Sequence, residues 1–184
     1  MWYAPTVTVP PASEPITLAA AKNQCRIVDT DTSFDSELTG YIAAARDHVE
    51  RYTGTPLVTR TVTINADRFA NLAHIPVVPL QSVTSIAYVD TAGAAQTLSA
   101  SIYEVRSDGL AASAVLKPGQ FWPAVLNGSR VTLTAVVGYS AVPDAIVHAV
   151  RLLVADYFAD HEIKADRAWS TLDSLLCNYR RGAS

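Results

Sequence analysis

Charged residues are scarce in this chain of 184 residues. Lys, Arg, Asp and Glu together make up 17% of it, whereas about 25% is typical of soluble domains. Hydrophobic residues reach 49%, and the net charge is only −3. Because the buried centres of interfaces are depleted of charge, we expect the protein to cover part of its surface in an oligomer or against a partner. The sequence contains no run of positive charge, which excludes the basic stripe that non-specific DNA binding requires.

Cysteines are also few, and their placement argues against a disulfide. Cys25 and Cys177 lie far apart in apolar helical patterns and form no CxxC pair, so we expect buried free thiols. The opening MWYAPTVTVPPASEP has neither a basic region nor a continuous apolar run, and we expect no signal peptide. No stretch approaches the ~20 apolar residues of a membrane span. These features predict a protein made in a reducing cytoplasm, with no membrane partner.

Motifs that would mark an enzyme are missing. The sequence contains no GxSxG elbow, no phosphate-binding glycine loop and no dinucleotide fingerprint. The segment from Asp29 to Asp35 resembles the start of a calcium loop, but Phe34 replaces the required glycine and Gly40 stands where the bidentate glutamate belongs. We interpret its polar residues as helix-capping and solvated loop groups. His48 and His148 lie beside apolar helical stripes, where packing histidines are expected. We therefore assign no catalytic, cofactor-binding or metal-binding residue.

Two blocks of helical periodicity flank the middle of the chain. In the front block, Thr17 is placed to cap a short helix. A second helix is predicted from about Asp35 to Tyr52, with Ser33 or Thr32 as its cap and Gly54 as its terminator. In the rear block, Pro143 favours the first turn of a third helix. The apolar residues of the two long helices recur at the 3.6-residue period: Leu38, Ile42, Ala45 and Val49, then Ile146, Val150, Leu153 and Val154.

Between the helical blocks the period changes from 3.6 to 2. Residues 58–64, 83–89, 102–105, 113–116 and 130–136 alternate in polarity, and turn sequences separate them. Pro76 and Pro79 exclude a central strand in their own segment. This spacing predicts a small antiparallel sheet or sandwich inserted into the helical body.

The two ends of the chain carry separate predictions. Four prolines make residues 1–16 an extended arm, and the alternation of Val7 and Val9 with threonines leaves a short strand and a disordered tail as open alternatives. After the charged link 160–168 comes an amphipathic segment, which either folds back onto the body or forms a docking helix. The predicted class is α+β. Its parts are the arm 1–16, a connector domain 17–163 (helical body 17–55 and 141–163, β insertion 56–140) and a C-terminal docking segment 164–184.

Several stretches in fixed order resemble one known family. They are PITLAAAK, AAARDHVERYTGTPLVTRT, VTLTAVVGYSAVPDAIVHAVRLLVADYF and the terminal LLCNYRR. Together they are similar to the head–tail connector (adaptor) proteins of long-tailed double-stranded DNA phages and phage-like particles. Cys177 and Asn178 depart from the family pattern, which has a small residue and a proline there.

The resemblance implies a structural virion protein without catalysis or cofactor. Such a protein forms a ring, normally of twelve copies, beneath the portal protein and joins the filled head to the next neck or tail protein. It implies a place at the head–tail junction of the virion, and in the host cytoplasm before assembly. DNA passes through the channel as cargo only. The portal-facing residues carried over from the family are Trp169, Leu172, Leu175, Leu176, Tyr179 and Arg180. The resemblance also allows the proline-rich arm to add a strand to a neighbouring subunit.

Two alternative functions remain at this point. The chain is either another neck component, such as a stopper or tail completion protein, or a small cytoplasmic ligand-binding protein or enzyme with a pocket between sheet and helices.

Overall fold

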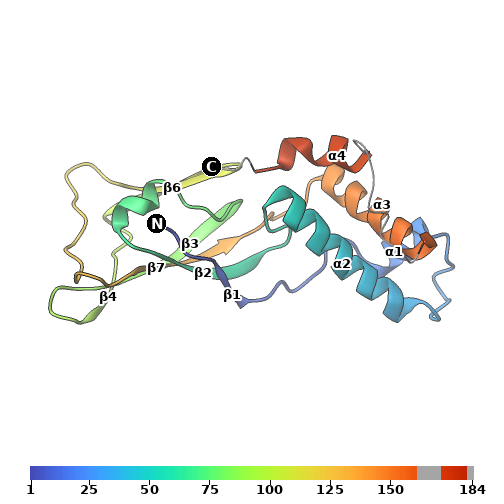
Figure 1. Ribbon diagram of the computed structural model, residues 1–184, viewed down its shortest axis with the longest axis horizontal. Coiled ribbons are helices and arrows are strands. Elements are labelled where there is room, and N and C mark those ends of the chain that lie inside the picture. Colours follow the sequence, from blue (N-terminus) through green and yellow to red (C-terminus); the bar gives the residue numbers. More distant parts are fainter. Residues whose placement is uncertain (161–170, 182–184) are drawn as a thin grey trace. The chain divides into compact units, whose positions relative to one another are not determined.

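The computed structural model describes residues 1–160 and 171–181, which fall into two units (Figure 1). The β unit contains residues 1–12 and 59–140, and the helical unit contains residues 13–58 and those from 141 onward. The elements of the helical unit are α1 (Leu18–Gln24), α2 (Asp35–Thr53), α3 (Asp144–Asp160), α4 (Thr171–Leu176) and the 3-10 turn η2 (Cys177–Tyr179). Within the described ranges no helix is both long and apolar enough to cross a membrane.

The β unit consists of one five-stranded antiparallel sheet and one hairpin. The sheet has the order β1-β2-β7-β3-β4, and β5 pairs only with β6. Its elements are β1 (Thr6–Val9), β2 (Arg60–Ala66), η1 (Phe69–Ala73), β3 (Leu80–Val89), β4 (Ala95–Thr97), β5 (Tyr103–Asp108), β6 (Ala111–Leu116) and β7 (Val131–Val137). The α+β class predicted from the sequence is confirmed. As expected from Pro76 and Pro79, no strand begins between η1 and Leu80.

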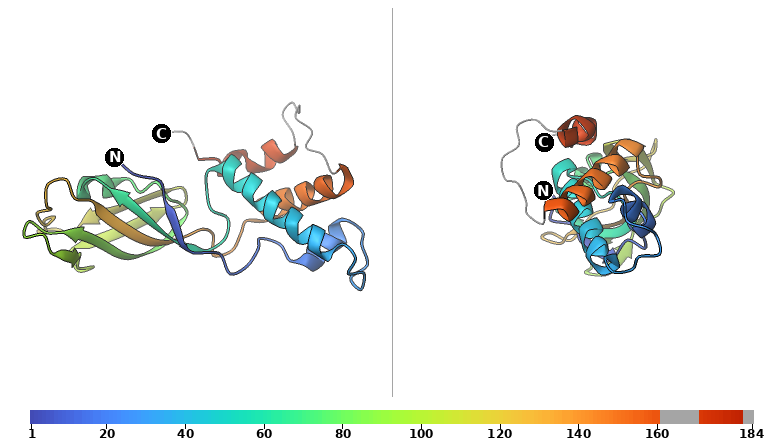
Figure 2. Two further views of the ribbon diagram at one scale, coloured as in Figure 1. Left: turned by 60° about the horizontal axis from the view of Figure 1, so that its bottom comes forward. Right: turned by 90° about the vertical axis from the view of Figure 1, so that its right-hand side faces the viewer.

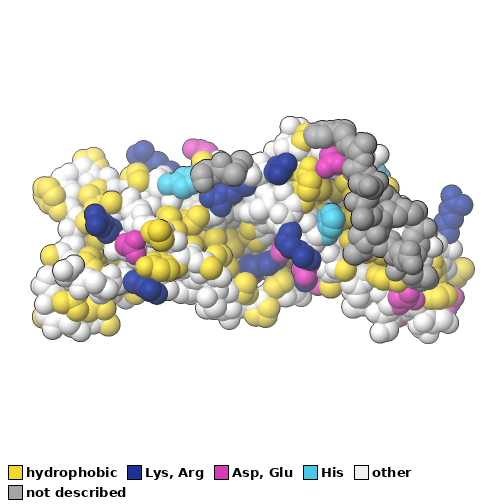
Figure 3. All heavy atoms as spheres, viewed as in Figure 1, with side chains coloured by type: hydrophobic (Ala, Val, Ile, Leu, Met, Phe, Trp, Pro, Cys, Tyr) yellow, Lys and Arg dark blue, Asp and Glu magenta, His cyan; other side chains and the backbone are white. Residues whose placement is uncertain are grey.

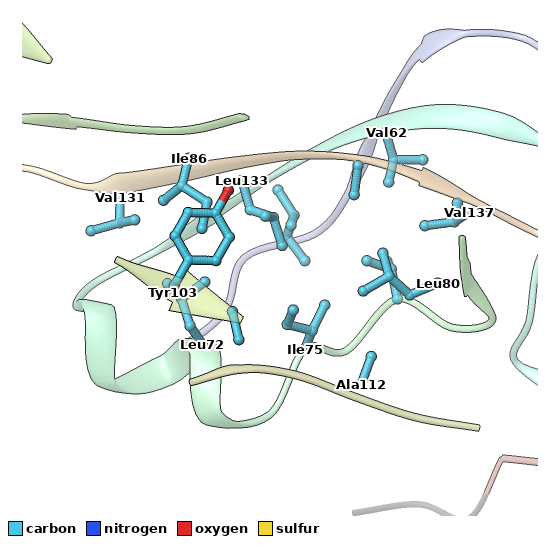
Figure 4. Close-up of a cluster of buried hydrophobic side chains, with 14 of the residues drawn as sticks. Val62, Leu72, Ile75, Leu80, Ile86, Tyr103, Ala112, Val131, Leu133 and Val137 are labelled. Atoms are coloured by element: carbon cyan, nitrogen blue, oxygen red, sulfur yellow. The ribbon is translucent and has the colours of Figure 1, made fainter. Parts of the chain in front are cut away.

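The core of the β unit lies between the sheet and a covering layer of η1, β5 and β6. Strand β7 alternates strictly, with Val131, Leu133, Ala135 and Val137 all fully buried. Figure 4 shows Leu133 and Ile86 of the sheet facing Leu72, Ile75 and Ala112 of the covering layer. Alternation places one side of each strand in this core and the other side away from it.

The side of the sheet that faces away from the core carries no charged residue in the described strands. Directly opposed residues of antiparallel strands point to the same side, so the registers Thr63↔Thr134, Ser85↔Thr134 and Ala87↔Thr97 extend this surface across the sheet. We call it the open face; by register it comprises Thr6, Val9, Thr61, Thr63, Asn65, Ser82, Ser85, Ala87, Val89, Ala95, Thr97, Thr132, Thr134 and Val136.

Of the two alternatives left open for the N-terminal arm, the strand is observed. Residues Thr6–Val9 pair with β2 of the same chain. The Trp2 Nε1 donates to the His74 carbonyl at 2.7 Å, and the Met1 ammonium lies 2.8 Å from the Asp67 carboxylate. Hydrogen bonds from that ammonium and from the Tyr3 hydroxyl lower the pKa of Asp67. The residues that precede the strand are thus tied to the β unit.

Helix termini follow the sequence predictions in part. The Thr17 hydroxyl accepts the Ala20 amide at 3.2 Å, and Gly54 ends α2 with a left-handed φ of 69°; both predictions are confirmed. The expected cap of α2 is wrong, because Phe34 occupies the N-cap without a side-chain hydrogen bond. The Ser33 amide instead donates to the Asp31 carboxylate within the preceding turn.

Two expectations of burial are also wrong. His48 and His148 are exposed, because each precedes a buried residue (Val49 or Ala149) and one helical step turns it out of the stripe. Both cysteines are free, as predicted, but only Cys25 is half-buried. Burial raises the pKa of the Cys25 thiol, whereas Cys177 lies exposed in η2.

A nearly buried ion pair joins α1 to the start of α2. Lys22 is only 4% exposed, its Nζ lies 2.6 Å from Asp35 Oδ1, and it also donates to the Asp29 carbonyl at 3.1 Å. Removing one partner of such a pair leaves the other charge without compensation. Asp29 and Asp35 resembled calcium ligands in the sequence. In the structure the Lys22 ammonium contacts the backbone carbonyl of Asp29 and the carboxylate of Asp35.

We predict that Lys22→Ala lowers the free energy of unfolding by about 1–3 kcal/mol, because Asp35 and the Asp29 carbonyl lose their donor. Urea unfolding followed by circular dichroism measures this change. The matched control is Lys117→Ala in the exposed β6–β7 loop, for which we expect a change within about 0.5 kcal/mol. Equal effects of the two substitutions would contradict the role assigned to the ion pair.

Candidate docking segment at the C-terminal end

Charged and polar groups in the described part of the chain do not build a metal site. No three His, Cys, Asp or Glu side chains come together there as ligands. In the loop that resembled a calcium site, hydrogen bonding by Ser33, chiefly its amide, lowers the pKa of Asp31, and Asp35 is paired with Lys22. Figure 3 shows Lys and Arg side chains dispersed over the viewed face without a continuous basic patch. The candidate site is therefore the amphipathic C-terminal segment.

The segment folds back onto the helical unit. Helix α4 packs against α3, and Leu176 at its end is 1% exposed. Figure 2 shows α4 (red) beside the C-terminal turn of α2 (teal). Burial of a leucine side chain of this kind is worth roughly 2 kcal/mol. The amphipathic pattern thus has a partner surface within the chain itself.

Backbone contacts hold the end of the segment on the last turn of α2. The Arg181 amide donates to the Thr53 carbonyl at 2.8 Å. Thr53 is fully buried, and its hydroxyl donates to the Val49 carbonyl at 2.8 Å. The left-handed Gly54 turns the chain at this point, and a Cβ added there would lie 3.5 Å from the Arg181 Cβ. The last turn of α2, with the Thr53 carbonyl as acceptor, therefore forms the surface on which the end of the segment rests; we call it the seat.

Tyr52 adds a side-chain contact to this seat. A hydrogen bond to the Asp173 carboxylate is the main cause of the raised pKa of Tyr52. The Arg180 guanidinium lies 5.4 Å from the centroid of the Tyr52 ring, within the range of a cation–π contact. A buried leucine, a backbone hydrogen bond and an aromatic ring between two charges thus all contribute to holding the segment.

The residues that the sequence assigned to portal binding differ in how far they are buried. Leu176 is buried in the helical unit, and Leu172, Leu175 and Tyr179 are half-buried. Arg180 is exposed. Trp169 lies outside the described residues. The role of Tyr52, Thr53 and Asp173 in seating the segment was missed, because nothing in the sequence indicates which surface an amphipathic helix covers.

These observations define the class of the protein: a helical body interrupted by a β unit, with a C-terminal segment that packs on the helical body. The chain belongs to the phage gp6-like head-tail connector proteins, whose family model matches residues 15–106. The connector family suggested by the sequence is therefore confirmed. The protein is thus a structural head–tail connector protein.

Solved structures of similar fold come from gene transfer agent (GTA) particles. A chain from the neck of the empty GTA particle, computed with C6 symmetry, has a TM-score of 0.80 and 21% identity over 99% of this chain and 97% of that one. A chain from the virion of the native particle has a TM-score of 0.79 and 21% identity, again over 99% and 97%. A third, from the native neck computed with C12 symmetry, has a TM-score of 0.69 and 22% identity over 96% and 97%. Curated protein sequences give no match.

We predict that Leu176→Asp releases the C-terminal segment, because a charge cannot occupy the buried leucine site. Hydrogen exchange in residues 171–181 then rises, while α2 and α3 stay protected. Mass spectrometry of peptides from the full-length protein measures this. The matched control is Cys177→Asp at the exposed neighbouring position, which leaves the exchange unchanged. Equal protection in both variants would contradict the anchoring role of Leu176.

Proposed function

We propose that the protein is a head–tail adaptor that forms a ring beneath the portal of a phage or phage-like particle. In this position it joins the DNA-filled head to the next neck or tail protein. Membership in the connector family supports the joining function. The similarity to GTA neck chains supports a place at the head–tail junction of the virion, reached from the host cytoplasm during assembly. The proposed role is structural and involves neither catalysis nor a cofactor.

A ring is the expected oligomer. The similar neck chains come from particles computed with C6 and C12 symmetry, and we propose twelve copies for this protein. A ring needs two different complementary surfaces on each copy. The low content of charged residues, 17%, favours extensive contact between copies. A net charge of −3 per copy repels phosphate, which favours passage of DNA through the channel over binding to its wall.

The observation that supports the portal contact is the position of the C-terminal segment on the helical unit, where it buries Leu176 but leaves Arg180 exposed. Residues 171–181 form a short amphipathic helix and a 3-10 turn that pack on α2 and α3. Aromatic and arginine residues are common anchors of interfaces. We propose that residues 164–184 dock on the portal through Trp169, Leu172, Leu175, Leu176, Tyr179 and Arg180. In this scheme the residues of the β unit face neighbouring copies or the next neck component.

We predict that removing residues 165–184 abolishes attachment to the portal. Negative-stain electron microscopy of the protein mixed with portal from the same particle measures this, and wild-type rings are expected to stack coaxially on the portal. Because the deletion also removes the buried Leu176, a second variant is needed. Arg180→Glu reverses an exposed charge and is expected to reduce portal binding at least tenfold while the fold is kept.

The matched control for the second variant is Arg151→Glu at an exposed position of α3, which leaves portal binding unchanged. Full portal binding by the truncated, folded protein would contradict the docking role of the segment. Binding of the wild type to tail components but not to portal would instead indicate a stopper or tail completion protein. A thermal shift with metals or nucleotides, in a protein that ignores the portal, would indicate a ligand-binding protein.

A further inference from the structure

The open face of the sheet has the properties of a covered surface. Sheets with one solvated side commonly place polar and charged residues there, whereas this face carries hydroxyl, amide and small apolar side chains only. Three strands of at least seven residues and two shorter ones, spaced about 4.8 Å apart, offer roughly 400 Å². This is about half of the ~800 Å² that each partner buries in a standard interface. The face is large enough to form a substantial part of one.

Four polar side chains at the centre of the open face pair with one another. The Thr132 hydroxyl donates to the Asn65 side-chain oxygen at 2.8 Å, and the hydroxyls of Thr63 and Thr134 lie 3.4 Å apart. Near the β1 edge, the Thr8 hydroxyl donates to the Thr61 carbonyl at 3.2 Å. Burying an unpaired polar group is costly, but groups already paired within the sheet lose little when an apolar surface covers them. The face is therefore suited to an uncharged, apolar partner.

The loop between β6 and β7 supplies such an apolar group. Phe121 is 83% exposed at this loop. The next residue, Trp122, stacks on Phe69 with ring centroids 5.1 Å apart and planes 7° apart. Before Phe121, the Gln120 amide donates to the Lys117 carbonyl at 3.1 Å. After it, the Leu126 amide donates to the Val89 carbonyl at 2.9 Å. An aromatic ring held outward by anchored neighbours loses little side-chain entropy when it binds.

We propose that the open face of one copy receives the Phe121 loop of the next copy. This inference rests on the proposed ring and names the surfaces that close it. Two different surfaces of one unit, a flat acceptor and a projecting aromatic, form the heterologous contact that a ring requires. Six of the eight large apolar side chains exposed among the described residues belong to the β unit: Met1, Tyr3, Val7, Val9, Phe121 and Leu126. Through Phe121, a second copy therefore brings an apolar ring to a face whose described strands carry no charged side chain.

The test uses one variant of each surface in the full-length protein. Thr134→Lys places a charge at the centre of the open face, where Thr134 opposes both Thr63 and Ser85. Phe121→Ser removes the projecting ring. Ala111→Lys, at the exposed first residue of β6, is the matched control for the added charge. If Thr134→Lys fails to fold by circular dichroism, Thr97→Lys on exposed β4 replaces it. Particle mass is measured by light scattering and by electron microscopy, with and without portal.

We predict that Thr134→Lys and Phe121→Ser each fold but do not close rings, while Ala111→Lys forms them as the wild type does. An equimolar mixture of the two defective variants is then expected to give dimers and nothing larger. In that mixture, the intact Phe121 of the first variant binds the intact face of the second, and the remaining surfaces are both defective.

Rings formed by either folded variant, or a mixture that stays monomeric, would overturn the inference. Loss of rings in Ala111→Lys as well would also overturn it, because any added charge would then suffice. A wild-type protein that forms no ring with or without portal would overturn the proposed function itself, and the two failures are thereby distinguished.

Discussion

The pairing of β2 with β7 is the contact on which both units depend. Arg60 at the start of β2 lies directly opposite Val137 at the end of β7, so the chain leaves the β unit beside the point where it entered. The Gln81 side-chain amide bridges the two crossing segments, donating to the Thr59 hydroxyl at 2.7 Å and to the Gly138 carbonyl at 2.9 Å. Without this pairing, α3 would not return to α2, and the helical core of Ile42, Val49, Ile146 and Val150 would lack one of its halves.

The family model matches residues 15–106 and therefore ends before β7, whereas the similar neck chain covers 99% of this chain at 21% identity. A sheet is specified by alternation and register, and many different residues satisfy both. Strand β7 needs only apolar residues at alternate positions and small polar ones between them. Its position between β2 and β3 is fixed by the registers on both of its sides.

Much of the fold was predictable from periodicity, because burial on one side imposes it. The stripe from Leu38 to Val49 and the alternation in β7 identified a helix and a strand correctly. The features that were not predicted depend on partners distant in sequence. Strand β1 forms only because β2 offers an edge, and β4 has just three exposed residues. The end of α2 became a seat because the C-terminal segment returns to it, and Tyr52 and Thr53 carry no signal of that role.

The C-terminal segment has one apolar stripe and two candidate partners, so it cannot satisfy both at once. Leu176 covers the chain's own core in the folded-back state, and a portal that binds the same leucine must replace roughly 2 kcal/mol of burial. The helix itself is short, six residues, and contributes little stability alone. If the portal offers an apolar surface of similar size, the free energy of moving the leucines from one surface to the other is close to zero. Additional contacts of the exposed Arg180 and the half-buried Tyr179 with the portal can then determine which state is favoured. Docking through Arg180 alone would leave the leucines seated, whereas docking through the whole stripe requires their release from α2 and α3.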